Sequence, residues 1–193
     1  MSAALRVVVI TASVRDGRIG PAIARWFQRT AVGLSQIEID DLDLAVFPLP
    51  TVISETPPED VAAAVAALSA RLAPADAVVV VTPEYNHSYP ASIKAAIDWT
   101  GAEWHAKPVA FVSYGGLAGG QRAVEHLRPI LSEMHAVPIR DVVSIHGPWD
   151  LFDADGELRE APGPDRAAKV LWERLTWWAL ALREAKERRP FEV

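Results

Sequence analysis

The sequence predicts an α/β protein built on one open sheet of five parallel strands, and three observations lead to this fold class. Five strand-like runs alternate with five helical segments along the chain, the pattern of right-handed β-α-β crossovers. Four of the five runs are apolar almost throughout, as in strands covered by helices on both faces. The length, 193 residues, suits roughly one domain. We therefore expect a single domain over residues 1–193, a three-layer sandwich with strand order 2-1-3-4-5, because a full dinucleotide fold needs a sixth strand.

The first half of the chain supplies two strands and two helices. Arg6–Thr11 is a β-branched run of strand length. Ile19–Ala31 follows a glycine-containing turn and has Pro21 in its first turn, a favourable place for proline. Gln36–Leu42 alternates apolar and polar residues, which predicts a half-exposed edge strand. Pro57–Ala73 opens with prolines and acidic residues, which suit the positive end of a helix.

The second half repeats this alternation. Ala77–Thr82, Pro108–Ser113 and Asp141–Ile145 are short apolar runs typical of buried strands. Pro90–Thr100 and Gly119–Met134 lie between them and are long enough for helices.

A long final helix is expected over Asp165–Arg188, with basic residues in its last turns, where the helix dipole favours them. Its tryptophans, Trp172, Trp177 and Trp178, are expected in the core or at an interface. The two long proline-containing connections are expected to be surface loops: Phe47–Pro58 and Gly147–Pro164.

Composition narrows the classes of function. The chain has no cysteine, which removes disulfides, thiolate metal sites and cysteine nucleophiles, and suits a reducing cytoplasm. No apolar run is long enough to span a membrane, and the N-terminus has no signal-peptide layout. The net charge of −6 argues against nucleic acid as the main partner. The five histidines lack paired metal-ligand spacing, so no metal site is expected.

In an open parallel sheet, ligands bind beyond the carboxyl ends of the strands, where the strand order reverses. The first loop at this position runs from Thr11 to Gly20. Ser13 offers a hydroxyl, Arg15 and Arg18 offer guanidinium groups, and the helix start at Ile19 and Gly20 offers backbone N–H groups, so the loop suits a phosphate monoester. It lacks the GxGxxG spacing of a resident dinucleotide.

The loops after the third and fourth strands are also unusual. Two prolines stiffen the segment from Pro83 to Pro90, whose backbone and tyrosines suit a flat heterocycle. Four glycines between Ser113 and Gly120 allow close approach of backbone to a ligand. The candidate residues are Pro83, Glu84, Tyr85, Asn86, Ser113, Tyr114, Gly115 and Gly116. Each loop alone also has a plain structural explanation: a solvated turn for the first, a turn with an asparagine cap and core-facing tyrosines for the second, and a flexible connection for the third. His87 is expected to be a surface residue.

These segments resemble a known family. Ser13-Val14-Arg15 with Gly17, Pro83-Glu84-Tyr85-Asn86 continuing through Pro90 to Trp99, and Lys107-Pro108-Val109 leading into Ser113-Tyr114-Gly115-Gly116 are similar to motifs of the NAD(P)H-dependent FMN reductases, whose fold is flavodoxin-like. Azoreductase-like and quinone-reductase-like proteins are members. The resemblance spans about residues 6–145. Two positions depart from it: Ala12 replaces a frequent glycine and Arg18 a frequent second serine.

The resemblance implies an oxidoreductase that transfers hydride from NADPH or NADH through bound FMN to a small acceptor, such as flavin, a quinone or an azo compound. No catalytic side chain is implied, because flavin N5 carries the hydride. Ser13, Arg15 and Arg18 would hold the phosphate, and the other two loops would line the isoalloxazine ring. Arg18, Arg122 and Lys107 remain open as readers of the NADPH phosphate.

The resemblance also implies a homodimer or a dimer of dimers, paired through the third and fourth helices, with Trp104 near the subunit boundary. The alternatives are a flavodoxin-type electron carrier without NAD(P)H turnover and a flavin-binding sensor.

Overall fold

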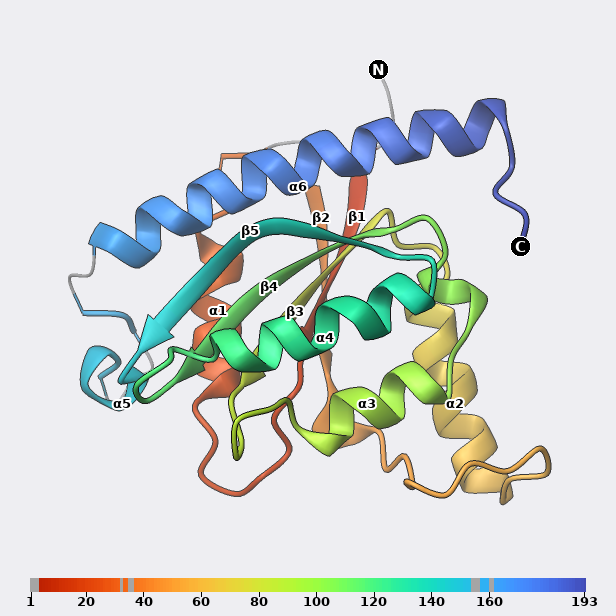
Figure 1. Cartoon of the computed structure of the whole chain (residues 1–193), viewed down its shortest axis with the longest axis horizontal. Coiled ribbons are helices and arrows are strands. Elements are labelled where there is room, and N and C mark those ends of the chain that lie inside the picture. Colours follow the sequence, from red (N-terminus) through yellow and green to blue (C-terminus); the bar gives the residue numbers. More distant parts are fainter. Residues whose placement is uncertain (1–3, 32, 35–36, 154–156, 160–161) are drawn as a thin grey trace.

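The structure, a computed structural model, describes residues 4–31, 33–34, 37–153, 157–159 and 162–193. Its five strands form one parallel sheet in the order β2-β1-β3-β4-β5, which confirms the predicted fold class and strand order (Figure 1). The strand bounds are β1 Leu5–Thr11, β2 Ile37–Asp43, β3 Ala77–Pro83, β4 Pro108–Gly115 and β5 Val137–His146. Residue Gln36 of the predicted second strand lies outside the described residues.

Helices cover both faces of the sheet (Figure 1). The helix bounds are α1 Gly20–Arg29, α2 Glu59–Leu72, α3 Ala91–Asp98, α4 Gln121–Glu133, α5 Pro148–Leu151 and α6 Pro162–Arg188, with short 3₁₀ turns η1 Leu44–Val46 and η2 Ala102–Trp104. Side chains of α1 and α6 form one hydrophobic core against the sheet. Those of α2, α3 and α4 form a second core on the other face.

Burial along the strands follows their place in the sheet. Every residue of the central strands β3 and β4 is buried, because both faces are covered. Strand β2 lies at one edge and is mostly half-exposed, as its alternating sequence predicted.

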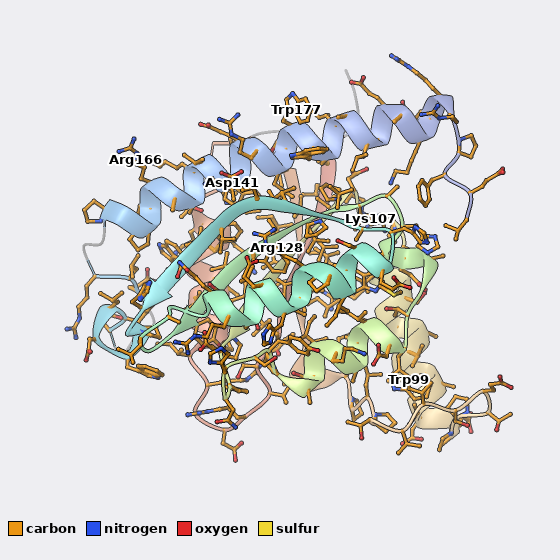
Figure 2. The ribbon with its side chains drawn as sticks, viewed as in Figure 1. Trp99, Lys107, Arg128, Asp141, Arg166 and Trp177 are labelled. Atoms are coloured by element: carbon orange, nitrogen blue, oxygen red, sulfur yellow. The ribbon has the colours of Figure 1, made fainter. Side chains whose placement is uncertain are left out.

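Strand β5, at the opposite edge, begins four residues earlier than expected, at Val137. This first part includes Pro138, which an edge strand tolerates, and it pairs with β4 across a register shift. The Arg128 guanidinium donates to the carbonyls of Ile139 (2.8 Å) and Arg140 (3.1 Å), so a helix side chain satisfies the outer groups of this edge (Figure 2).

The tryptophans of α6 divide between core and surface. Trp172 is buried and stacks on Phe27, with ring centroids 4.6 Å apart, while its Nε1 donates to Thr30 Oγ1. Trp177 and Trp178 are 62% and 37% exposed, so their place in an interface stays a prediction.

The expectation that the connection after β5 is a plain surface loop was wrong. The connection after β5 contains the short helix α5 and an isolated bridge between Phe152 and Leu158, and Phe152 is buried in the core. Trp104 is fully buried in its own chain, where its Nε1 donates to Thr100 Oγ1, and its place near a subunit boundary stays a prediction. An indole that finds a local hydrogen-bond acceptor packs into the core as readily as it does into an interface.

Lys107 is a buried amine at the edge of the sheet opposite the strand carboxyl ends (Figure 2). Its Nζ donates to the carbonyls of Leu72 and Ala73, at the C-terminus of α2. Burial, together with the nearby Lys186, lowers the pKa of Lys107 to about 8. This placement disfavours Lys107 among the three candidate readers of the NADPH phosphate, because the expected site lies at the opposite end of the strands.

The free energy of unfolding is expected to rise with pH between about 8 and 10.5 through Lys107. In this window the unfolded chain still holds the proton that the native state has released, so native stability increases with pH. The contribution amounts to about 3 kcal/mol. Urea unfolding across this range should show the full rise in wild type and in Lys94→Met, a control at a half-exposed lysine of α3. The rise should be smaller in Lys107→Met, where Lys186 is left as the neighbouring lysine whose pKa burial lowers. The same slope in all three proteins would contradict the assignment.

Candidate cofactor and active site

The predicted site residues meet in one cavity at the carboxyl edge of the sheet. It has a volume of about 200 Å³, and its lining residues are Ser13, Arg15, Gly17, Arg18, Ile19, Pro83, Glu84, Tyr85, Tyr114, Gly115, Gly116 and Trp149. Of the predicted set only Gly20, Asn86 and Ser113 do not line it, and each adjoins a lining residue in the chain. A larger groove of about 790 Å³ lies between α4, β5 and α6, away from these strand ends.

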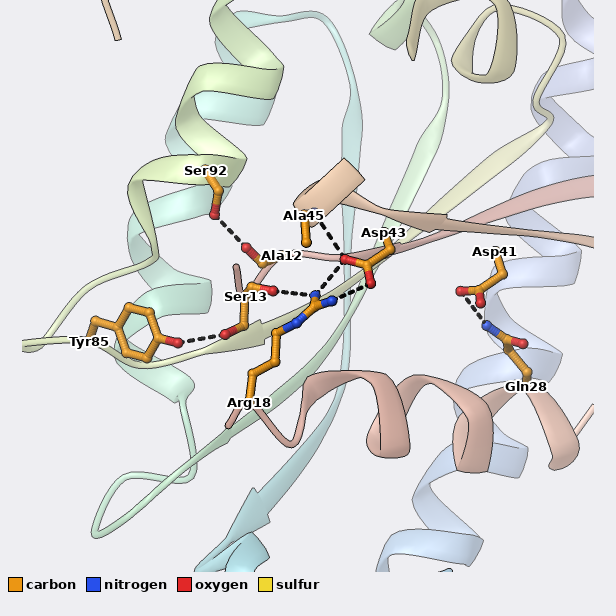
Figure 3. Close-up of polar contacts among 9 residues, drawn as sticks. All are labelled: Ala12, Ser13, Arg18, Gln28, Asp41, Asp43, Ala45, Tyr85 and Ser92. Atoms are coloured by element: carbon orange, nitrogen blue, oxygen red, sulfur yellow. Dashed lines mark hydrogen bonds and ion pairs between the residues drawn. The ribbon is translucent and has the colours of Figure 1, made fainter. Parts of the chain in front are cut away.

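Three hydroxyl groups gather where β1 ends and α1 begins. Ser13 is buried, and its Oγ shares a 2.6 Å hydrogen bond with Tyr85 Oη (Figure 3). Tyr114 is 4% exposed, and its buried Oη makes no hydrogen bond of good geometry among the described residues, although the Ser13 hydroxyl is near enough to act on the pKa of Tyr114. Burial raises the pKa of Tyr114, so the phenol is protonated and able to donate. Helix α1 also begins without a side-chain cap, so its N-terminus can attract an anion.

The two arginines of this loop have different surroundings. Arg15 is exposed, lies 6.0 Å from the centroid of the Tyr85 ring, and has no ion pair within the part of the chain that the structure describes. Arg18 donates to both carboxylate oxygens of Asp43, at 2.5 and 2.6 Å, and to the backbone oxygen of Ser13 at 2.6 Å (Figure 3). The hydrogen bond to Asp43 raises the pKa of Arg18.

The same pair changes the acidity of the carboxyl group. Burial acts to raise the pKa of Asp43, but the hydrogen bonds from Arg18 and from the Ala45 N–H outweigh it and hold that pKa below its ordinary value. The pair is therefore ionised at neutral pH.

The loop after β3 is a tight hairpin, a form that was not predicted from the sequence. Tyr85 and Ser88 exchange two backbone hydrogen bonds (2.8 and 3.1 Å), and Asn86 and His87 both have positive φ, 49° and 73°. Two consecutive positive φ angles identify a type I′ turn, for which Asn-Gly is the usual signal. This turn has Asn-His in place of Asn-Gly, so the sequence did not indicate it. His87 is exposed, as expected, and its ring centroid lies 6.2 Å from that of His126.

Replacing His87 by glycine is expected to raise the free energy of unfolding by about 0.5 to 1 kcal/mol, because glycine adopts positive φ without the Cβ penalty. His87→Ala, which removes the imidazole but keeps Cβ, should bring no such gain. Urea denaturation of the two variants measures the difference. An equal effect of both would mean that the strain does not lie at His87.

Glu84 joins the second and third loops. Its N–H donates to the carbonyl of Tyr114 (3.1 Å), and its carboxylate pairs with Arg122 at 2.7 Å. The other carboxylate oxygen, Oε2, is buried without a partner in the described residues. Arg122, a candidate reader of the NADPH phosphate, thus has a carboxylate partner in this structure.

The glycine-rich loop turns back on itself instead of lying open. Ser113 Oγ donates to the carbonyl of Gly119 (2.8 Å), so this predicted residue stabilises its own loop and does not reach the cavity. Gly119 and Gly120 have positive φ, 55° and 82°. Trp149, in the connection after β5, lines the cavity and was also missed. Extending the carboxyl-edge rule to the fifth strand would have found it.

Membrane spans and metal clusters are both absent from the described residues. None of their helices is long and apolar enough to cross a membrane, and no group of three or more His, Asp or Glu among them could hold a metal ion.

The sequence is similar to a group of flavin-dependent reductases. Residues 5–150 match the family model described as NADPH-dependent FMN reductase. An NAD(P)H-dependent FMN reductase of Schizosaccharomyces pombe is 32% identical over 149 residues, 72% of this chain and 73% of that protein. A quinone reductase of Escherichia coli K12 is 35% identical over 143 residues, 71% of this chain and 74% of that protein.

Solved structures show the same likeness. FerB, a flavoenzyme NAD(P)H:acceptor oxidoreductase from Paracoccus denitrificans, aligns with a TM-score of 0.68 at 25% identity, covering 94% of this chain and 98% of its own. An azoreductase of Bacillus anthracis shares the fold, with a TM-score of 0.56 at 18% identity.

Proposed function

The chain belongs to the family of NADPH-dependent FMN reductases, and on this premise we propose that the cavity at the carboxyl edge of its sheet holds FMN and that NAD(P)H and the electron acceptor use it in turn. The chain is an oxidoreductase of the NAD(P)H-dependent FMN and quinone reductase type. The family match disfavours a flavodoxin-type carrier. The residue roles, the acceptor and the assembly are part of the proposal.

The residues around Ser13 fit a phosphate group. The observation that carries this fit is Tyr114 Oη, a buried donor without a partner that lies against the start of α1, where a Cβ on Gly20 would meet it at 2.8 Å. Buried polar groups are nearly always hydrogen-bonded, so an orphan donor at an uncapped helix N-terminus suits an anion. Arg15 adds a cation without a carboxylate partner among the described residues, and Ser13 adds a hydroxyl. These three residues would hold the FMN phosphate.

The other two loops fit the ring system. The backbone N–H groups of Asn86 and Gly116 make no hydrogen bond within the described residues, so they are free to donate to the polar edge of a heterocycle. The adjoining Glu84–Tyr114 hydrogen bond fixes the two loops relative to each other. Donors fixed in this way stabilise negative charge without reorganising.

FMN, held by these residues, would supply the hydride-transfer chemistry between a nicotinamide donor and the acceptor. The protein supplies binding and orientation. Tyr85 and Trp149 bound the cavity with aromatic surface, which suits a flat substrate. Because an aromatic surface accepts many flat molecules, it favours small acceptors such as quinones, flavins and azo compounds, and either NADPH or NADH as donor.

The assembly is proposed to be a homodimer or a dimer of dimers that works in the cytoplasm. A cavity of about 290 Å³ between the segment 44–51 and α3, lined by Val14, Phe47 and Leu49 among others, provides apolar surface beside the site. The absence of cysteine suits a reducing compartment. Light scattering should give a multiple of the 21.0 kDa chain mass; a monomer at micromolar concentration would exclude this assembly.

Steady-state kinetics tests the function. With FMN added, the protein is expected to oxidise NADPH or NADH in the presence of a benzoquinone. Double-reciprocal plots at different quinone concentrations should be parallel, as in a ping-pong mechanism. Binding of FMN without any turnover would instead support the electron carrier.

A further inference from the structure

Arg18 lies in the predicted phosphate loop but is bound to Asp43. The carboxylate accepts two hydrogen bonds from the guanidinium, a bidentate pair with planar fork geometry, which is among the stronger kinds of ion pair (Figure 3). The two side chains are only 20% and 28% exposed, so water screens the pair less than a surface salt bridge.

Asp43 connects the loop to the sheet. It is the last residue of β2 and the register partner of Thr11, the last residue of β1, where the loop begins. Its Oδ1 also accepts a hydrogen bond from the Ala45 N–H (3.0 Å), which fixes the carboxylate at the start of η1. The carboxylate is therefore an immobile anchor beside the loop.

Arg18 closes the loop from its far end. Its Nη1 donates to the backbone oxygen of Ser13, five residues earlier, as well as to Asp43. Both hydrogens of that nitrogen are thus committed within the protein. The position and orientation of Ser13 in turn set its hydrogen bond with Tyr85.

We propose that Arg18 and Asp43 are a positioning pair that holds the phosphate loop in its binding shape, and that Arg18 is not itself the cation that neutralises the phosphate. The inference rests on the proposed FMN site. Its basis is the contrast between two arginines three residues apart: Arg18 is neutralised by a fixed carboxylate, whereas Arg15 has no such partner in the described residues.

Replacing Asp43 by asparagine separates the two roles, because they predict opposite signs. If Arg18 is a positioning residue, losing its anchor loosens the loop, and the FMN dissociation constant rises about tenfold, which corresponds to about 1.4 kcal/mol. If Arg18 is a phosphate ligand, the substitution frees its charge and removes a nearby anion, so FMN binds more tightly. Riboflavin, which has no phosphate, should bind Asp43→Asn and wild type about equally.

Asp41→Asn is the matched control. Asp41 lies two residues away on the same strand, and its side chain accepts a hydrogen bond from Gln28 Nε2 at 2.8 Å (Figure 3). The substitution changes the net charge by the same amount without touching the loop. It is expected to leave both flavin affinities near the wild-type values.

A double-mutant cycle of Arg18 and Asp43 provides a second test, because it measures how far the two residues depend on each other in FMN binding. Arg18→Gln should weaken FMN about as much as Asp43→Asn, and the double variant should be no weaker than either single variant. If Arg18→Gln instead lowers FMN affinity as much as Arg15→Ala does, and independently of Asp43, the proposal is overturned.

Hydrogen exchange of the FMN-free protein tests the pair without any flavin. Amides in residues 11–20 are expected to exchange several-fold faster in Asp43→Asn than in wild type or Asp41→Asn. Unchanged exchange would refute the positioning role even if FMN binds. Failure of wild type to bind FMN, with faster exchange in Asp43→Asn, would refute the proposed cofactor site and leave the pair as a structural clamp.

Discussion

Replacement of Arg15 by alanine is expected to weaken FMN binding by between about tenfold and a hundredfold, while riboflavin binding changes little. Among the arginines that line the cavity, Arg15 has no carboxylate partner in the described residues. A charge-assisted hydrogen bond to a phosphate contributes about 1.5 to 3 kcal/mol. Because riboflavin differs from FMN only in the phosphate, the ratio of the two dissociation constants isolates this contact.

Fluorescence titration of the two flavins measures the ratio. Arg25→Ala is the control, because Arg25 is an exposed arginine on α1 outside the cavity and its loss changes the net charge equally. Added salt should weaken FMN binding to wild type and to Arg25→Ala more than to Arg15→Ala. Equal losses for FMN and riboflavin would show that Arg15 does not contact the phosphate.

The second large effect is expected at Gly120, where alanine should lower the free energy of unfolding by about 3 kcal/mol or more. Gly120 has φ of +82°, and a Cβ there would lie 2.6 Å from the Tyr114 backbone nitrogen and 2.7 Å from Ser113 Cβ. Left-handed backbone costs a residue with Cβ about 1 to 2 kcal/mol, and overpacking costs about 1 to 3 kcal/mol. The neighbours are backbone and a buried strand residue, so they cannot easily move away.

Variants at two other glycines separate the cost of the left-handed backbone from the cost of overpacking. Gly17 has φ of +64° with open space around its Cβ position, so Gly17→Ala should show the backbone cost alone, about 1 kcal/mol. Gly116 has neither feature, and Gly116→Ala should leave stability within about 0.5 kcal/mol of wild type. Chemical denaturation ranks the three variants. If Gly120→Ala is no less stable than Gly17→Ala, close packing of the loop against β4 is not what requires glycine.

The strands and the site loops could be predicted because their signals are local. Runs such as Ala77–Thr82 contain enough β-branched residues to identify strands, and the alternation of elements fixes their crossovers. The carboxyl-edge rule then brings Ser13, Glu84 and Tyr114 together without any knowledge of side-chain contacts.

What escaped prediction depends on contacts between distant residues. The pairing of Arg18 with Asp43 was not predicted, because Asp43 lies 25 residues away and meets Arg18 only through the pairing of β1 with β2. The hairpin at Asn86 and His87 lacks the glycine that usually marks its turn type. Trp149 follows the fifth strand, and the carboxyl-edge rule was applied only to the loops after the first, third and fourth strands.

The most direct test is anaerobic titration of the FMN-loaded protein with NADPH and NADH, followed through the visible absorption of the flavin. The protein is expected to retain FMN on gel filtration, to lose that absorption on addition of the nucleotide, and to regain it when a quinone is added. A protein that retains no flavin, or retains flavin that neither nucleotide reduces, would contradict the account.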